Sequence, residues 1–190
     1  NDGGTYVAPV LEMKKLVVHE IGVHVLRSIT GSETNLLPLK DGLADYEAAE
    51  EGLAMIMEQA LSGKYKEIGA NYYITVGLAY FDNMDFRDIY EAKWRLAVLL
   101  SMKKEKNDVT EEEVNKAKNF AYTNVIRIMR GTDELPWFKD LAYYNGCVDM
   151  WKYFERNIGD DEAARFALIG KMNPTSASDR KVLYEASTVS

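Results

Sequence analysis

The chain has 190 residues, of which 47% are hydrophobic and 28% charged, and this globular balance excludes a disordered chain. The length favours one domain, and the formal net charge of −7 excludes nucleic acid as an expected partner, because phosphate backbones need clustered Lys and Arg. No apolar run reaches the roughly 18 residues of a membrane span, so we expect no membrane partner and a cytoplasmic location.

Segments with helical periodicity follow one another along the chain, and none shows sustained strict alternation, so we predict an all-α fold. The first helix should cover residues 11–29 and end before Gly31, and a loop with Pro38 should follow it. The whole chain, residues 1–190, is expected to form a single helical domain that ends in a frayed polar tail. Further helices are predicted at 45–61, 65–81, 86–102, 111–130, 141–156 and 161–170. The capping box of Thr110 and Glu113 opens the helix at 111–130.

The first helix carries both histidines of the chain, His19 and His24, in the pattern HExxxH. Zinc enzymes often use HExxH, because residues i and i+4 share one helix face. Residues five apart point about 140° away from each other on a regular α-helix, too far to reach one ion. A shared metal therefore requires a π-bulge or kink between the histidines, where Gly22 would make the distortion less costly.

Two histidines and one carboxylate with an open fourth position make a catalytic zinc site. Glu20, next to the first histidine, could then act as the general base for a metal-activated water. The same ligand set describes non-haem Fe(II) oxygenases, and a non-enzymatic helical domain with a structural metal is a further alternative. The simplest alternative is two unrelated histidines, each satisfied by ordinary hydrogen bonds.

The third ligand should be a carboxylate on a neighbouring helix. The segment "DYEAAEEGLA" offers Asp45, Glu47, Glu50 and Glu51. Spacing alone does not choose among these four, so the zinc site is predicted only to lie between two adjacent helices.

The segment "HEIGVHVLRS", followed about thirty residues later by "EEGLA", resembles the QEGLA-motif bacterial proteins and the related microtubule-associated tyrosine carboxypeptidases of animals. The resemblance implies a zinc metallopeptidase with one Zn²⁺ per chain. It also implies that the third ligand is the glutamate before the glycine of EGLA, which is Glu51. A peptide or protein C-terminal tail would be the substrate.

Two downstream elements extend the resemblance: "RIMRG" is similar to an RxxRG element of the family, and "FKDLAYYNG" to FxKDxxYxxG. They imply that Arg127, Arg130 or Lys139 holds the substrate's terminal carboxylate, because a guanidinium pairs well with a carboxylate. Tyr143 could donate a hydrogen bond to the oxyanion. Without the family match, the arginines would be a solvated helix terminus and Tyr143 a half-buried core residue.

Three departures from the family pattern put substrate choice in question more than chemistry. Glu50 stands where the family has glutamine, the loop before "EEGLA" looks shorter than in the animal members, and the family's long N-terminal portion has no counterpart here. Tyrosine removal is therefore not expected to carry over unchanged. Nothing in the sequence indicates an oligomeric state.

Overall fold

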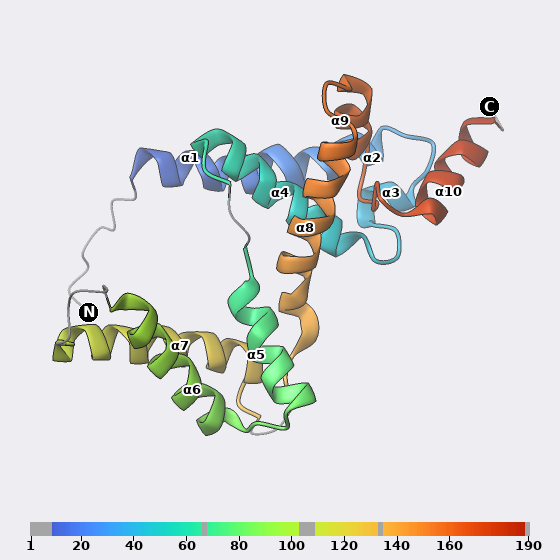
Figure 1. The fold of residues 1–190 in the computed structure, drawn as a ribbon. Helices are drawn as coiled ribbons and strands as arrows, with labels where there is room; N and C mark the ends of the chain where they lie inside the picture. Colours follow the sequence, from blue (N-terminus) through green and yellow to red (C-terminus); the bar gives the residue numbers. More distant parts are fainter. Residues whose placement is uncertain (1–8, 66–67, 103–108, 133–134, 189–190) are drawn as a thin grey trace, which may run out of the picture. The chain divides into compact units, whose positions relative to one another are not determined.

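The computed structural model describes residues 9–65, 68–102, 109–132 and 135–188, which are helical and contain no strand within those ranges (Figure 1). The prediction of an all-α fold is therefore confirmed. The helices form two compact units, Asn1–Ile68 with Ala142–Ser190 and Gly69–Leu141. That residues 1–190 act as one catalytic domain stays a prediction.

The first unit holds the histidine helix and the helices packed against it. Its elements are α1 (Val10–His19), the π-helix η1 (Glu20–Val25), α2 (Leu26–Ser32), α3 (Pro38–Asp41), α4 (Tyr46–Ser62), α8 (Leu141–Arg156), α9 (Asp161–Ala167) and α10 (Ala177–Thr188). Helix α4 contacts both α1 and η1, so the acidic segment at its start lies beside the histidines.

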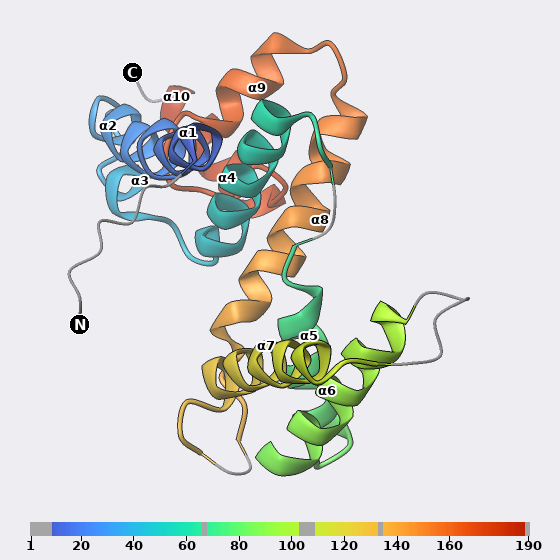
Figure 2. The ribbon, with the colours of Figure 1, turned by 90° about the vertical axis from the view of Figure 1, so that its left-hand side faces the viewer.

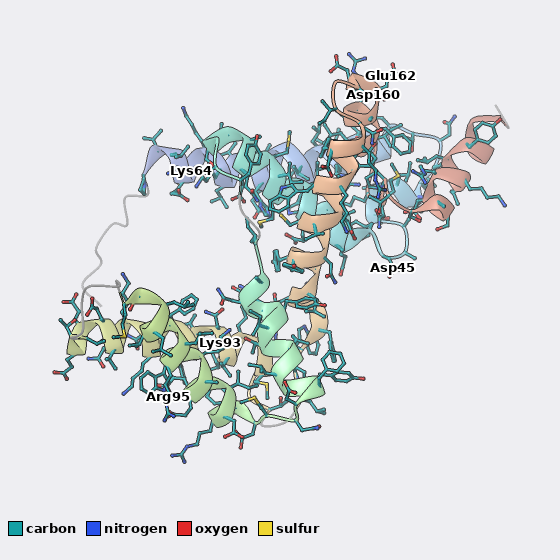
Figure 3. All side chains as sticks on the ribbon, in the orientation of Figure 1. Asp45, Lys64, Lys93, Arg95, Asp160 and Glu162 are labelled. Atoms are coloured by element: carbon teal, nitrogen blue, oxygen red, sulfur yellow. The ribbon has the colours of Figure 1, made fainter. Side chains whose placement is uncertain are left out.

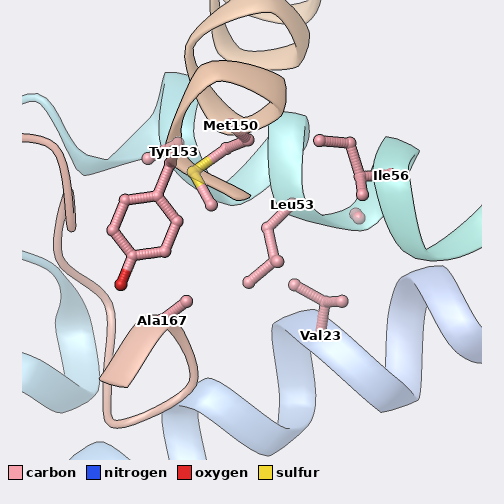
Figure 4. Packing of buried hydrophobic residues seen from close by; sticks show 8 residues of the cluster. Val23, Leu53, Ile56, Met150, Tyr153 and Ala167 are labelled. Atoms are coloured by element: carbon pink, nitrogen blue, oxygen red, sulfur yellow. The ribbon is translucent and has the colours of Figure 1, made fainter. Parts of the chain in front are cut away.

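The hydrophobic core of this unit joins η1 to α4, α8 and α9. Val23 is the only buried residue of η1, and Figure 4 shows its side chain directed at Leu53 and its neighbours. Burying an aliphatic side chain contributes about 1.5–3 kcal/mol, so this contact fixes the distorted segment against α4. The buried cluster consists of Val23, Ala49, Leu53, Ala54, Ile56, Met150, Tyr153 and Ala167.

Helices α4 and α8 approach closely at two glycines (Figure 2). A Cβ atom on Gly52 would lie 2.0 Å from the carbonyl oxygen of Gly146, and one on Gly146 would lie 1.7 Å from that of Ala48. No side chain fits at either position, because both obstacles are backbone atoms. The glycines of the "EEGLA" and "FKDLAYYNG" segments thus form one crossing point.

The second unit consists of α5 (Ala70–Phe81), α6 (Phe86–Ser101), α7 (Glu111–Met129) and the short 3₁₀ helix η2 (Phe138–Asp140). Helix α7 packs against α5 and α6 around Ala79, Ile89, Val125 and Met129. The capping box predicted at its start is present, with Thr110 and Glu113 bonded reciprocally.

Three local expectations are wrong. The first helix does not end before Gly31, because α2 continues to Ser32. Gly31 instead lies against the backbone of Leu39, and a Cβ atom on Gly31 would lie 2.3 Å from the Leu39 carbonyl oxygen. Pro38 does not sit in a plain loop, since it opens the one-turn helix α3. The tail after 170 is not frayed throughout, because residues 177–188 form α10.

Candidate metal centre

The HExxxH segment has the distortion that its spacing requires. Residues Glu20–Val25 form a π-helix, in which the N–H of Leu26 donates to the carbonyl of Ile21, five residues back. His19 is the last residue of α1, and His24 lies inside η1. Residues five apart stand one turn apart in such a segment, and the two imidazole rings lie 4.8 Å apart between centroids. The predicted π-bulge is confirmed.

Gly22 lies in η1, but the π-helix does not require a glycine there. Its φ is not among the positive values of the chain, and a Cβ would meet the side chain of Val18 at 3.9 Å, an ordinary contact. The distortion is instead accompanied by the burial of Val23 and by side-chain contacts of both histidines with α4.

His19, His24 and Glu51 converge, and each can offer one ligand atom such that the three atoms lie within 4.8 Å of one another. The Nε2 atom of His19 is 3.5 Å from Oε2 of Glu51. Two ligands about 2.1 Å from a tetrahedral ion are themselves about 3.4 Å apart, so this separation suits zinc. All three side chains are partly buried, and they come from adjacent helices, as predicted.

The Oε2 atom of Glu51 is buried and makes no hydrogen bond to any residue that the structure describes. A buried carboxylate oxygen without a partner is costly and calls for an explanation, such as an ion. Two imidazoles and one carboxylate are also the donor set of catalytic zinc sites. The residues present therefore fit a zinc ion.

The other nitrogen of each imidazole contacts a carboxylate of α4. Nδ1 of His19 lies 2.6 Å from Oε1 of Glu58, and Nδ1 of His24 lies 2.8 Å from Oε1 of Glu50. Glu58 was not predicted from the sequence, and Glu50 was predicted only as one of four possible ligands and as a departure from the family's glutamine. Glu58 follows Glu51 by seven residues, two helical turns on one face, and that spacing was the available signal.

Glu50 is part of a buried ionic network. Arg27 donates from Nη1 to Oε2 of Glu50 at 3.2 Å and from Nη2 to the carbonyl of Met172, and Nζ of Lys171 lies 3.6 Å from Oε1 of Glu50. Arg27 is fully buried, and this burial lowers the pKa of its guanidinium. The network connects α2, α4 and the segment before α10.

The carboxylates around His19 change its acid strength. The Glu51 carboxylate contributes most and, with that of Glu58, raises the pKa of His19 above its ordinary value, although desolvation acts in the opposite direction. Negative charge around this imidazole favours any cation placed there, whether a proton or a metal ion.

The two predicted catalytic side chains belong to the same unit as the cluster. Glu20 is the first residue of η1 and is exposed. Tyr143 lies in the first turn of α8 with a partly buried side chain. Their roles as general base and oxyanion donor stay predictions.

The arginines and Lys139 belong to the second unit, and Asp140 joins the two arginines. Arg127 donates from Nε and Nη2 to the buried Asp140 at 3.2 and 2.8 Å, whereas Nη2 of Arg130 is 3.9 Å from the same carboxylate. The guanidinium of Arg127 stacks on Tyr72, and that of Arg130 on Trp137. Lys139 is exposed. The "RIMRG" and "FKDLAYYNG" elements thus contact each other, and substrate binding by these three residues stays a prediction.

Comparison with known proteins relates one segment to a family. Residues 9–68 match the family of the microtubule-associated tyrosine carboxypeptidase, and this segment includes His19, Glu20, His24 and Glu51. This segment is therefore related to that family, as the sequence resemblance predicted. No curated protein and no solved structure matches the chain.

Among the described residues, no helix combines the length and the apolar character that crossing a membrane requires.

Proposed function

We propose that the chain is a zinc-dependent metallopeptidase of the carboxypeptidase type, with one Zn²⁺ held by His19, His24 and Glu51. The observation that carries this proposal is the convergence of these three donors from the end of α1, the π-helix and α4, with the buried Oε2 atom of Glu51 making no hydrogen bond to the described residues. The match of residues 9–68 to a carboxypeptidase family supports the reaction class.

The chemistry is the hydrolysis of a C-terminal peptide bond. When bound, zinc polarises the scissile carbonyl and lowers the pKa of its water towards ~7. Glu20 accepts the proton of the attacking water as its oxygen bonds to the carbonyl carbon. As the C–N bond breaks, Glu20 returns that proton to the leaving amine.

Two further roles follow from the resemblance. The hydroxyl of Tyr143 would donate a hydrogen bond to the oxyanion, where negative charge develops. Arg127, Arg130 and Lys139 would receive the terminal carboxylate. Arg130 and Lys139 are the stronger candidates, because Asp140 already occupies the Nε and Nη2 donors of Arg127.

The substrate would be the C-terminal tail of a peptide or protein, processed in the cytoplasm. A net charge of −7 disfavours the approach of strongly acidic tails. We therefore expect neutral or basic tails to be cleaved faster than acidic ones.

The proposal is tested with wild type and Glu20→Gln, purified without added metal and analysed for metal content. Both proteins should hold about one zinc per chain, because Glu20 is not a ligand. The zinc-loaded proteins are then incubated with a mixed peptide library, and the new C-termini are read by mass spectrometry. Wild type should remove C-terminal residues, and Glu20→Gln should be roughly 10²–10⁴-fold slower.

Full activity of Glu20→Gln would contradict the role of its carboxylate. Iron as the metal would favour an oxygenase. Bound zinc without cleavage of any peptide would instead favour a structural site.

A further inference from the structure

Helix α4 supplies more to the histidines than the single carboxylate of Glu51. Glu58 contacts Nδ1 of His19, and Glu50 contacts Nδ1 of His24, at 2.6 and 2.8 Å. We propose that Glu58 and Glu50 are positioning residues that hold the proton of each imidazole on Nδ1, so that Nε2 of both histidines faces the metal. This inference rests on the proposed zinc site.

A neutral imidazole carries one proton, on either nitrogen, and a neighbouring acceptor decides which. A carboxylate accepts only, so Glu58 and Glu50 each require an N–H at Nδ1. Nε2 is then the lone-pair nitrogen in both rings, and in His19 it faces the proposed ligand Glu51, 3.5 Å from its Oε2 atom. Such an outer carboxylate also fixes the ring orientation and raises the basicity of the ligand nitrogen.

The two carboxylates differ in their electrostatic surroundings. Glu50 has a side chain only 6% exposed and is neutralised by Arg27 and Lys171, at 3.2 and 3.6 Å. The Glu58 side chain is 25% exposed, and the structure places no cationic side chain of the described residues in an ion pair with it apart from the His19 imidazole. The charge of Glu58 therefore acts on His19 and on a cation bound to it, whereas the charge of Glu50 is largely neutralised by Arg27.

Because of these surroundings, the same change from Glu to Gln should have different effects at the two positions. Glu58→Gln removes a negative charge that no Lys or Arg of the described residues neutralises, so zinc should bind roughly 10–100-fold more weakly. Glu50→Gln keeps an acceptor for Nδ1 of His24 but leaves the buried Arg27 without its counterion. Its zinc affinity should fall less than about tenfold, and its metal-free form should melt at a lower temperature than wild type.

Zinc affinity is measured by competition with a chelator. The melting temperature is measured by thermal unfolding of the metal-free proteins. Glu47→Gln is the matched control, because Glu47 is an exposed carboxylate of the same helix and the change removes the same charge. It should leave both quantities near wild type. Unchanged zinc affinity of Glu58→Gln, or an equal loss in Glu47→Gln, would overturn the inference.

A second measurement does not need the metal. Nitrogen NMR of the imidazoles, at a pH where both rings are neutral, reports which nitrogen carries the proton. Wild type should show Nδ1–H for both rings, and Glu58→Ala should move the His19 proton towards Nε2 while His24 stays unchanged. Nε2–H in wild type overturns the inference even if zinc binds. Absence of zinc binding with Nδ1–H intact overturns the proposed function while the tautomer assignment stands.

Discussion

The histidine cluster of the first unit and the cationic side chains of the second unit differ in what satisfies their polar atoms. In the cluster, the Oε2 atom of Glu51 is buried without a hydrogen bond, 3.5 Å from the Nε2 atom of His19. In the second unit, Arg127 pairs with Asp140 at 2.8 Å, and Lys93, which is labelled in Figure 3, donates to the carbonyl of Asn71 and the hydroxyl of Thr75.

The difference illustrates two situations in which a polar group lies inside a protein. Buried polar atoms that the protein itself satisfies stabilise a fold, whereas atoms left without a partner point to a missing ligand. This contrast supports the proposal that the histidine cluster binds a ligand, whereas the buried carboxylate of Asp140 is already satisfied by Arg127.

The largest effect is expected for the loss of a histidine. His24→Ala should lower zinc affinity at least ~100-fold, because even an outer partner of a ligand contributes ~10–100-fold. Titration against a chelator measures the change. Arg130→Ala, in the second unit, is the control and should bind zinc as wild type does. Equal affinities for wild type and His24→Ala would break the contrast.

The next effect concerns Lys93, whose burial lowers its pKa to about 8 from an ordinary value of 10.5. Below pH 8 the lysine is charged in both the folded and the unfolded chain, so the folded state bears the full cost of burying the charge. Between pH 8 and 10.5 the unfolded chain binds more protons, and stability therefore rises with pH. The gain should reach roughly 3 kcal/mol.

Urea unfolding at a series of pH values checks this rise, and Lys93→Met is the control that removes it. Only the difference between the two proteins is diagnostic, because tyrosines also titrate near pH 10. A constant difference from pH 7 to 10.5 would mean that Lys93 keeps its ordinary pKa.

The smallest effects separate the two arginines. Arg127→Ala removes two charge-assisted hydrogen bonds from the buried Asp140 and should lower the free energy of unfolding by about 2 kcal/mol. Arg130→Ala loses a longer ion pair and an exposed cation–π contact, so the cost should stay below about 1 kcal/mol. Urea unfolding followed by circular dichroism measures the free energy of unfolding of both variants. Equal losses would show that Asp140 does not distinguish the two partners.

Much of the first unit follows from the sequence. Helical periodicity predicts the all-α fold, and the five-residue spacing of His19 and His24 predicts the π-helix, because no regular helix brings such residues together. The contacts of Glu58 and Glu50 are not predictable in this way. They depend on how α4 is rotated against α1, which is decided by packing around Val23 and Leu53.

Other features of the structure could not be predicted from the sequence for related reasons. Gly52 and Gly146 belong to two of the family elements, but only the crossing of α4 and α8 shows why each lacks a side chain. Helix α10 is polar, and its start is held by local turn contacts of Asp179 rather than by a hydrophobic period. The partner of Arg127 lies thirteen residues away, beyond any local pattern.

The most direct test of the zinc site is X-ray absorption at the zinc edge, on protein purified without added metal. We predict about one zinc per chain, with two imidazole nitrogens and carboxylate or water oxygens at about 2.0–2.2 Å. Glu51→Gln should lose the metal or change its oxygen shell. A sulfur ligand, which only Cys147 or a methionine could supply, or the absence of stoichiometric metal would contradict the assignment of His19, His24 and Glu51.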